Sequence, residues 1–355
     1  MSMHIKHIYL FSSFNIQGVS TRYRGIYVLN ELKDTFGLTS TFVYPGYRFR
    51  EIIKFIKAYL SILLFRKKNS VIIFQKLHSK GIYTRLLKFL LRIRPSNTIY
   101  DTDDADYIRF EKDNIHHFMG HCKLCTVGSQ ALFEYTRKKN ENVLLLGSPV
   151  INHNERKINR NKTLHIGWIG DYGMNNGSTA PYSHKISLTK LFFPILKDLS
   201  FTVKLTLLGI KDPDDKLEIE EYFKSCSNIE LNIPENINWL DEQGLYHLIK
   251  EFDIGVSPMV HHEFNMAKSA FKAKQYLSCG VPVLASPVGE NLNVIKDGYN
   301  GYICQTSQDF KHRIMEFHEM PDGQYQQLCD CALKDNPLYS IDRYCKDLIR
   351  YYSSS

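Results

Sequence analysis

The chain has 355 residues, more than one hydrophobic core usually serves, so its length predicts two domains. Hydrophobic residues make up 43% of it and aromatic residues 13%, which excludes global disorder. The formal net charge of +8 suits anionic partners without choosing among sugar nucleotides, acidic lipid surfaces and nucleic acids. Eight scattered cysteines and no recognisable signal peptide predict reduced thiols in a cytoplasmic protein. No second Cys or His pair follows residues 121–125 at ligand spacing, so we expect no zinc site.

The first elements predict a doubly wound α/β domain. An apolar strand, a loop containing Gly18 and a helix follow one another at residues 4–12, 15–20 and 21–36. In such domains ligands bind at the carboxyl ends of the strands. Arg22 and Arg24 open the helix, where they either reach an anion or stay solvated, because one loop with one glycine is a weak signal.

Two apolar stretches, residues 49–68 and 85–94, carry basic residues at their edges. The longest uninterrupted apolar part of the first, residues 58–65, is far too short to span a bilayer. A basic amphipathic helix with aromatic residues is typical of a membrane interface, whereas the alternative is two core helices with solvated basic edges. With the net charge added, the pattern favours peripheral contact of residues 49–68 with an anionic membrane.

Four aspartates, Asp101, Asp103, Asp104 and Asp106, lie at the end of the strand that begins at residue 98. Carboxylates at such a position are placed for catalysis or for binding hydroxyl groups. Three interpretations stay open. Asp101 and Asp103 hold a divalent metal, the group faces a cleft and binds an acceptor, or Asp104 or Asp106 caps the next helix.

The polar run 153–162 predicts an interdomain linker, after which strands and helices alternate again. A strand at residues 164–169 ends at Gly170 and precedes a loop rich in Gly, Asn and Ser at 171–178. Further strands are expected at 201–208, 229–233 and 253–256, and helices at 186–199, 218–225 and 240–252. This alternation predicts a second parallel-sheet domain.

A short helix is predicted over residues 270–278, because this stretch lacks Gly and Pro, Ser269 is a suitable N-cap and Gly280 ends it. The apolar run 281–285 then predicts a buried strand, followed by a tight turn at 286–289.

Lys268, Lys272 and Gln275 are expected on one face of this helix, within about 60° of one another. Two cations beside a helix N-terminus favour a di-anion such as a diphosphate, and Gln275 is placed to bind the hydroxyl pair of a ribose. A solvated basic helix face is the alternative.

The run from residue 252 to 304, with its GVPVLAS and DGYNGY portions, resembles the donor-binding segment of retaining GT-B glycosyltransferases of family 4. Supporting similarities are IGWIG, STRYRG, YDTDDADY and TVGSQALFEY, at residues 166–170, 20–25, 100–107 and 126–135. The resemblance implies two Rossmann-like domains facing a cleft: an acceptor-binding domain over 1–155 and a nucleotide-sugar-binding domain over 160–335. It also implies that residues 336–355 form a helix crossing back to the first domain, and that no metal or other cofactor is required.

The resemblance further implies site residues. Lys268 and Lys272 are similar to basic positions at the donor diphosphate, and Asp101 or His78 would stand in for a histidine that the family often has beside the donor sugar. The catalytic residues implied are Lys268, Lys272 and Asp101. The donor-binding residues implied are Gly18, Arg24, Gly170, Lys268, Lys272, Gln275, Gly289, Glu290 and Asn291. The acceptor or cleft residues implied are Arg22, Asp103 and Asp104.

Two positions depart from the family pattern of two glutamates. Ala267 occupies the place of the first, where its side chain cannot form a hydrogen bond, and Glu263 is the nearest substitute. Gln275 occupies the place of the second and keeps an acceptor oxygen without the charge. These departures bear on how the donor sugar and the nucleotide are bound.

The function implied is transfer of a sugar from a nucleotide-diphosphate donor to a polysaccharide or glycolipid acceptor of the cell envelope. Retention of anomeric configuration and independence of metal are implied with it, in a cytoplasmic protein with contact to the inner face of the membrane. The alternative is a non-catalytic nucleotide-sugar or carbohydrate-binding protein of the same fold. Nucleic-acid binding is not expected, because no nucleic-acid-binding motif accompanies the charge.

Overall fold

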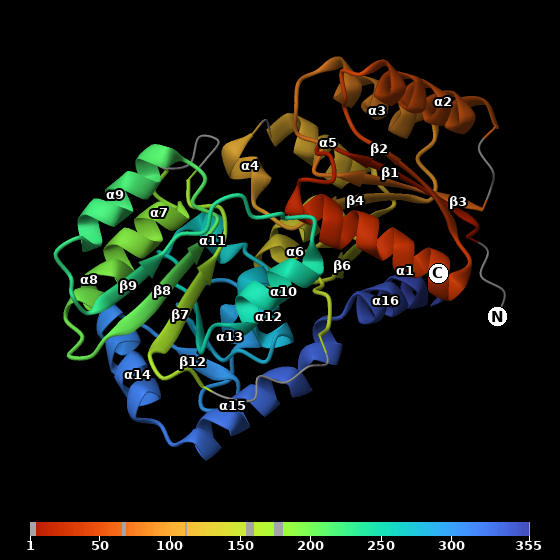
Figure 1. Cartoon of the computed structure of the whole chain (residues 1–355). Helices are drawn as coiled ribbons and strands as arrows, with labels where there is room; N and C mark the ends of the chain where they lie inside the picture. Colours follow the sequence, from red (N-terminus) through yellow and green to blue (C-terminus); the bar gives the residue numbers. More distant parts are fainter. Residues whose placement is uncertain (1–4, 66–68, 111, 154–159, 174–179, 355) are drawn as a thin grey trace. The chain divides into compact units, whose positions relative to one another are not determined.

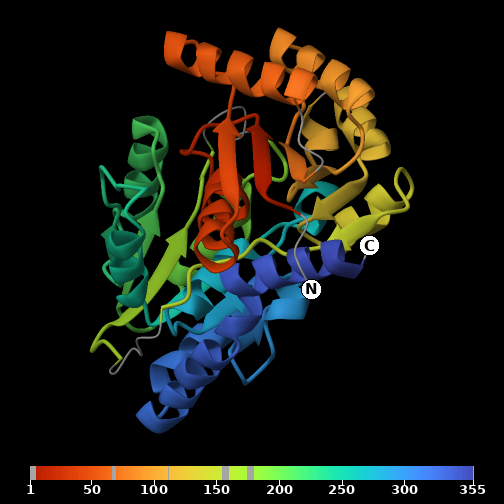
Figure 2. The ribbon, with the colours of Figure 1, turned by 90° about the vertical axis from the view of Figure 1, so that its right-hand side faces the viewer.

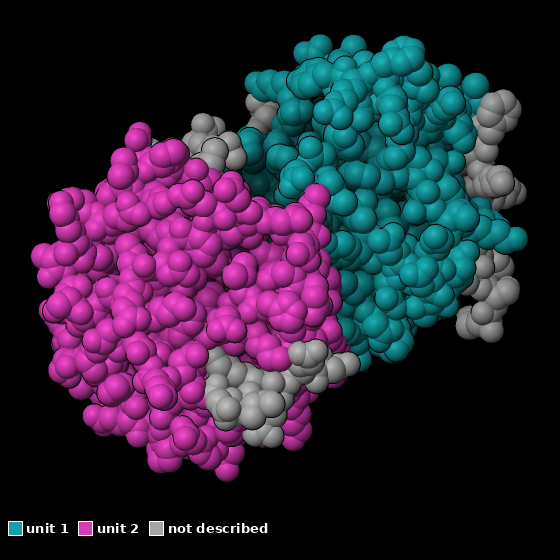
Figure 3. All heavy atoms as spheres, in the orientation of Figure 1, with its two compact units in different colours: residues 1–149, 267–269, 339–355 teal, residues 150–266, 270–338 magenta. Residues whose placement is uncertain are grey.

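The computed structural model describes residues 5–65, 69–110, 112–153, 160–173 and 180–354 (Figure 1). The chain forms two compact units (Figure 3). Unit 1 comprises residues 1–149, 267–269 and 339–355, and unit 2 comprises residues 150–266 and 270–338.

Unit 1 is built on six parallel strands in the order β2-β1-β3-β4-β5-β6. The strands are β1 (His7–Ser12), β2 (Thr39–Val43), β3 (Ser70–Gln75), β4 (Thr98–Thr102), β5 (Leu124–Val127) and β6 (Val143–Leu145). Every residue of β3, β4 and β5 is buried, as expected for central strands covered by helices on both faces.

Helices cover both faces of this sheet. They are a π-helical stretch (Thr21–Ile26), α1 (Tyr27–Phe36), α2 (Phe49–Phe65), α3 (Ile82–Ile93), α4 (Asp106–Arg109), α5 (Lys112–His121), α6 (Gln130–Arg137) and α16 (Ile341–Ser354). The last helix of the chain, α16, follows the strands and helices of unit 2 in the sequence and lies beside α1 of unit 1 (Figure 1). Its Tyr344, Cys345 and Leu348 join the core that contains Val28 and Leu32, so one face of α16 contributes to the hydrophobic core of unit 1.

Unit 2 also contains six parallel strands, in the order β12-β11-β10-β7-β8-β9. They are β7 (Leu164–Ile169), β8 (Val203–Leu208), β9 (Ile229–Asn232), β10 (Ile254–Ser257), β11 (Val283–Ala285) and β12 (Gly301–Ile303). From the central strand β7, the chain first adds β8 and β9 on one side of the sheet. It then adds β10, β11 and β12 on the other side. The carboxyl ends of β7 and β10 therefore mark the switch point of the sheet, where ligands bind in folds of this kind.

The helical elements of unit 2 are α7 (His184–Ser187), a π-helical stretch (Leu188–Phe192), α8 (Phe193–Lys197), α9 (Pro213–Phe223), α10 (Glu242–Lys250), α11 (Glu263–Met266), α12 (Phe271–Ser278), α13 (Asn291–Val294), α14 (Ser307–Glu319) and α15 (Asp322–Lys334). A 3-10 turn, Asn336–Tyr339, then leads to α16. Glycines let two aromatic rings pack on the central strands: a Cβ at Gly167 would lie 2.0 Å from the Phe252 ring, and one at Gly255 would lie 2.3 Å from the Tyr276 ring.

The predicted α/β class with two parallel sheets is confirmed. The helix predicted to start after Ser269 starts later, at Phe271, because Ala270 has a left-handed backbone with φ of 54° and stands as the N-cap. Parts of the predicted linker and loop, residues 154–159 and 174–178, and the basic end of the first apolar stretch, residues 66–68, lie outside the described residues.

None of the eight cysteines, all of which lie within the described residues, forms a disulfide bond. Within the described ranges, no helix combines the length and the apolar character that crossing a membrane requires.

Candidate functional site

The helix α12 is anchored at the switch point of unit 2 by one tyrosine. The hydroxyl of Tyr276 accepts a hydrogen bond from the N–H of Ile169 in β7, at 2.9 Å, and donates one to the carbonyl of Val256 in β10, at 3.2 Å. Tyr276 is fully buried. The residues one turn earlier on α12 are therefore positioned beside the carboxyl ends of β7 and β10.

Lys272 lies one turn before Tyr276 and extends along Gly170, the residue that follows β7. A Cβ at Gly170 would lie 2.6 Å from the Cε of Lys272, so a side chain there would displace the lysine. The ammonium Nζ lies 2.7 Å from Nε2 of His184 and 5.9 Å from the centre of the Trp168 ring. Because an ammonium only donates, Nε2 of His184 is the acceptor and its proton sits on Nδ1. This geometry holds a half-buried cation at the switch point.

The loop after β11 lies in the same unit and closes on itself. Ser286 accepts a hydrogen bond through Oγ from the N–H of Met259, at 3.0 Å, and its carbonyl accepts one from Nδ2 of Asn291, at 3.0 Å. Gly289 has φ of 59°, a conformation that glycine adopts without strain. Asn291 is fully buried, whereas Glu290 is half-buried. Asn291 therefore shapes the loop, and Glu290 is the more accessible of the two residues.

Gln275 is half-buried on α12, one turn beyond Lys272. Glu263 begins the short helix α11 and is exposed, and Ala267 is buried. The carbonyl of Ala267 accepts a hydrogen bond from Oγ of Ser129, at 2.8 Å. The backbone at Ala267 is thus held inside unit 1.

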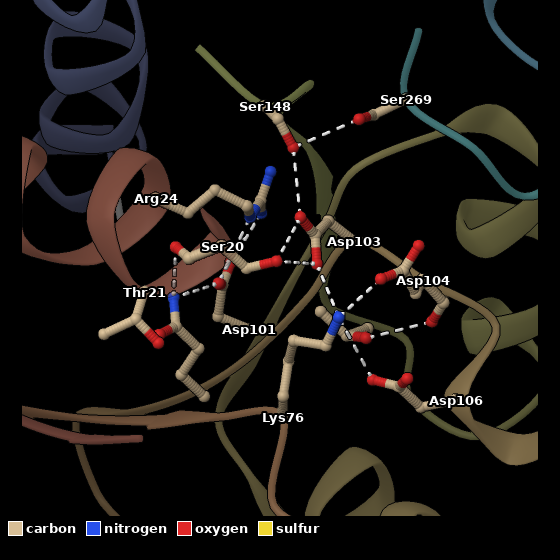
Figure 4. A network of polar contacts seen from close by, with 12 residues as sticks. Ser20, Thr21, Arg24, Lys76, Asp101, Asp103, Asp104, Asp106, Ser148 and Ser269 are labelled. Atoms are coloured by element: carbon tan, nitrogen blue, oxygen red, sulfur yellow. Dashed lines mark hydrogen bonds and ion pairs between the residues drawn. The ribbon is translucent and has the colours of Figure 1, made fainter. Parts of the chain in front are cut away.

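Three aspartates that follow β4 in unit 1 gather around one lysine (Figure 4). Nζ of Lys76 lies 3.1 Å from Asp103, 2.6 Å from Asp104 and 3.5 Å from Asp106. Lys76 is buried and directly follows β3. Within the described residues, no three His, Cys, Asp or Glu side chains form a group that would hold a metal ion. A cation from the chain itself therefore neutralises these carboxylates.

Burial and neighbouring charges shift the pKa values of this group in opposite directions. Burial alone would raise the pKa of Asp104, but Lys268 and Lys76 overcome it and hold that pKa well below its usual range. Burial raises the pKa of Asp106 to about 6; Lys76 opposes the rise, and the charges of Asp104 and Asp103 add to it. Asp106 therefore titrates closer to neutrality than an ordinary aspartate does.

The predicted catalytic Asp101 and donor-binding Arg24 form a buried ion pair. Arg24 donates through Nε to Oδ2 of Asp101, at 3.2 Å, and through Nη2 to Oδ1, at 2.5 Å, and its side chain is fully buried. Asp101 also accepts hydrogen bonds from Gln75, at 3.0 Å, and Thr126, at 2.7 Å. Nη1 of Arg24 donates to the carbonyl of Leu146. These contacts argue against both predicted roles, because each charge is already bound within the core of unit 1.

Arg22 and His78 are also held within unit 1. Arg22 is buried and donates through Nη1 to the carbonyls of residues 16 and 17, at 3.2 and 3.1 Å, which shapes the loop around Gly18. His78 stacks on Phe110 at 3.8 Å between ring centres. Its pKa is lowered to about 4, mainly by burial and further by Lys76 and Arg109, so the ring is neutral at pH 7. Arg22 therefore supports the loop rather than reaching outward.

Lys268 is not on the helix, which corrects the predicted face shared with Lys272. It belongs to the three-residue segment 267–269 of unit 1, and its Nζ lies 2.6 Å from Oδ1 of Asp104. Oγ of Ser269, instead of capping α12, is 3.1 Å from Oγ of Ser148 (Figure 4). Of the three residues predicted to share a face, the helix carries only Lys272 and Gln275.

Two residues with a role in these arrangements, one in each unit, were missed from the sequence. His184 stands 88 positions before Lys272, and no local pattern links them. Lys76 directly follows β3, whose sequence is a largely apolar run, so its place at the carboxyl end of a strand was a usable signal.

Comparisons with known proteins bear on the fold and the family. Residues 181–319 match the family described as Glycosyl transferases group 1. No curated protein matches the chain.

Solved structures resemble the chain over nearly its full length. The sucrose-phosphate synthase of Thermosynechococcus elongatus is 12% identical, with a TM-score of 0.70 and coverage of 98% of each chain. HepE of Anabaena, solved in complex with UDP, is 10% identical, with a TM-score of 0.66 and coverage of 99% of this chain and 100% of that one. A glycosyltransferase of Rickettsia africae is 11% identical, with a TM-score of 0.67 and coverage of 99% and 98%. The GT-B fold and the family match across residues 181–319 together indicate that the chain is a glycosyltransferase.

Proposed function

We propose that the protein transfers a sugar from a nucleotide-diphosphate donor to a polysaccharide or glycolipid acceptor, with retention of anomeric configuration and without a metal ion. Lys272 carries the proposal, because its ammonium is the cation that α12 presents beside Gly170 at the switch point of unit 2. Retention is supported by the resemblance of residues 252–304 to retaining enzymes.

The donor site in this proposal is built from elements of unit 2. Lys272 and the first N–H groups of α12 bind the diphosphate, since both carry positive charge. Gln275 binds the ribose hydroxyls, and the loop over 286–291 approaches the sugar with Glu290. Gly170 leaves the space in which the lysine reaches the phosphates.

The rate enhancement would come mainly from electrostatic stabilisation. As the bond between the anomeric carbon and the phosphate oxygen breaks, negative charge grows on the leaving diphosphate. A lysine already held by His184 and Trp168 needs little reorganisation to stabilise that charge. The same charge is the one a metal ion would otherwise neutralise, which supports a metal-independent reaction.

The acceptor is proposed to be a glycan or a lipid-linked glycan of the cell envelope, glycosylated at the inner face of the membrane. HepE of Anabaena was solved with UDP and glucose, so glucose and other hexoses are the first donor sugars to examine.

The second candidate is a non-catalytic nucleotide-sugar or carbohydrate-binding protein. It is favoured by Ala267, which is buried and whose carbonyl is bonded to Ser129, and by the uncharged Gln275. Both positions lack the carboxylate that the family resemblance leads one to expect.

The test is a panel of uridine, guanosine and thymidine diphosphate sugars, read by melting shift and by slow release of nucleotide without acceptor. We expect one donor to raise the melting temperature and to be hydrolysed. Lys272→Ala should slow that hydrolysis by about 10² to 10³-fold, the typical loss for one preorganised charge-stabilising donor.

Lys224→Ala is the matched control, because Lys224 lies in the same unit with a side chain that is 72% exposed. It should change neither turnover nor stability. Donor-induced stabilisation without hydrolysis would favour the binding protein. An equal loss of melting temperature and turnover in Lys272→Ala would make Lys272 a structural residue.

A further inference from the structure

The helices α2 and α3 of unit 1 expose an unusual amount of apolar surface. Of the 18 large hydrophobic residues that are exposed in the described part of the chain, nine lie between residues 47 and 93. These nine are Tyr47, Phe49, Ile52, Ile56, Leu60, Leu64, Ile82, Phe89 and Ile93. Phe49 and Ile82 each expose 76% of their surface. Patches of this kind on a soluble domain indicate a binding surface.

The exposed residues form a stripe on each helix. On α2, Ile52, Ile56, Leu60 and Leu64 recur every four residues, which places them on one face. The opposite face is buried through Ala58 and Ile62. The outer face of α2 is therefore apolar even though its inner face already supplies the core.

The third helix repeats the arrangement. Ile82, Phe89 and Ile93 fall within about 40° of one another on α3, while Leu87 and Leu90 are buried. Like α2, α3 has one apolar face in the core and a second that is exposed.

The two helices are neighbours, as both ribbon views show (Figure 1 and Figure 2). The rings of Phe55 and Tyr83 lie 5.2 Å apart between them, and Nη2 of Arg94 donates to the carbonyl of Leu63 at 2.7 Å. Two adjacent helices of unit 1 therefore each carry an exposed apolar stripe.

The charge around the stripes is predominantly positive. Residues 48–65 and 82–94 contain eight Lys or Arg and a single acid, Glu51. The basic residues are Arg48, Arg50, Lys54, Lys57, Arg85, Lys88, Arg92 and Arg94. On α3, Arg85 and Arg92 are exposed next to the apolar stripe, and on α2 so are Lys54 and Lys57.

We propose that α2 and α3 form a docking surface that lies in the headgroup region of an anionic lipid bilayer. The apolar stripes enter the boundary of the acyl chains while the flanking lysines and arginines contact lipid phosphates. Charge complementarity favours an anionic bilayer, because an apolar protein partner would not need basic residues flanking both stripes. A nucleic acid, in turn, would leave the apolar stripes exposed.

The membrane surface is independent of the reaction, so vesicle binding tests it alone. The full chain is floated with vesicles of phosphatidylcholine and with vesicles that contain about one-third phosphatidylglycerol, a fraction that gives a strongly anionic surface. We expect binding to the anionic vesicles that weakens as salt is added.

Two double variants separate the contributions. Ile56→Ser with Leu60→Ser should weaken binding by about tenfold or more, because two apolar contacts with the acyl boundary are lost. Lys54→Gln with Lys57→Gln should weaken it by about 30-fold, since each cation near an anionic surface contributes about a factor of five. All four positions are exposed or nearly so, and the variants should melt with the wild type.

Leu217→Ser and Lys224→Gln are the matched controls, because these side chains are well exposed on unit 2. Neither should change vesicle binding. Equal binding to both kinds of vesicle, no binding at all, or binding that survives both double variants would overturn the proposal. The proposal would also be overturned if the protein did not bind vesicles but self-associated, and if Ile56→Ser with Leu60→Ser abolished that self-association. The surface would then be an interface between copies of the chain. Release of nucleotide is measured in parallel, so an inactive protein that binds vesicles refutes only the proposed reaction.

Discussion

Replacing Asp101 by asparagine separates a structural role from a catalytic one. The substitution keeps the shape of the side chain and removes its charge. Arg24 is then left as a cation with no exposed side-chain surface and no full counter-charge. Removing one member of a buried ion pair typically lowers the free energy of unfolding by about 3–5 kcal/mol. In a domain of this size each kcal/mol lowers the melting temperature by about 2–4 °C, so the expected fall is roughly 6–20 °C.

The assay is thermal unfolding followed by circular dichroism, together with donor hydrolysis measured well below the melting temperature. Asp101→Asn should be much less stable and still hydrolyse the donor at a rate within about threefold of wild type, because Asp101 touches no substrate in our proposal. Asp342→Asn is the control. It removes an ion pair with Lys346 whose two side chains are about half exposed, so it should cost less than about 1 kcal/mol.

A double variant, Arg24→Met with Asp101→Leu, should recover more than half of the lost stability, since no buried charge then lacks a partner. An Asp101→Asn protein that melts within about 2 °C of wild type but loses about 10²-fold in turnover would refute this reasoning and restore the catalytic assignment.

Three further predictions follow from the same geometry. Because burial raises the pKa of Asp106 to about 6, the folded protein binds a proton that the unfolded chain releases near pH 3.8, and stability falls as pH rises through that window. Asp106→Asn should therefore raise the free energy of unfolding by about 3 kcal/mol at pH 7.5 and have little effect on it below about pH 4. Urea unfolding at both pH values measures this difference, and equal effects at the two pH values would contradict the prediction. Lys268→Met should lower the free energy of unfolding by about 1 kcal/mol, because it removes the half-buried ion pair with Asp104. The donor should still raise the melting temperature of this variant, and loss of that shift would place Lys268 in the donor site. His184→Ala should lower kcat about tenfold with little change in KM, because the imidazole ring positions the ammonium of Lys272. His184→Gln should recover part of the lost kcat. An unchanged kcat in His184→Ala would show that His184 has no role in the site.

The alternation of strands and helices was predictable because each apolar run is bounded by glycine or polar residues. In β3, β7 and β11 every residue is buried, and largely apolar runs of this kind are visible in a sequence. Local pattern was sufficient for these features.

The roles of Asp101 and Arg24 were not predictable in the same way. Both residues stand where ligand-binding residues stand, one at the end of β4 and one near the start of the first helix. They are 77 positions apart, and only the fold shows that they bind each other. A charged residue that faces a ligand and one that faces a partner have the same local sequence signal.

The start of α12 shows a second limit of local rules. Ser269 has the composition of an N-cap, but its hydroxyl is engaged by Ser148 and its neighbour Lys268 by Asp104. Ala270 then stands as the N-cap with a left-handed backbone and no side-chain capping hydrogen bond. Tertiary contacts of three residues outweigh the capping preference.

The segment 267–269 has a consequence for recombination between related enzymes. It lies in the sequence of the second half but is folded into unit 1, where Ser129, Asp104 and Ser148 bind it. In a chimera that takes residues 1–149 from a related enzyme, residues 267–269 would face the side chains of that enzyme in place of Ser129, Asp104 and Ser148. A compatible exchange must transfer residues 1–149, 267–269 and 339–355 together. The structural unit that can be exchanged is therefore encoded by three separate segments of the gene.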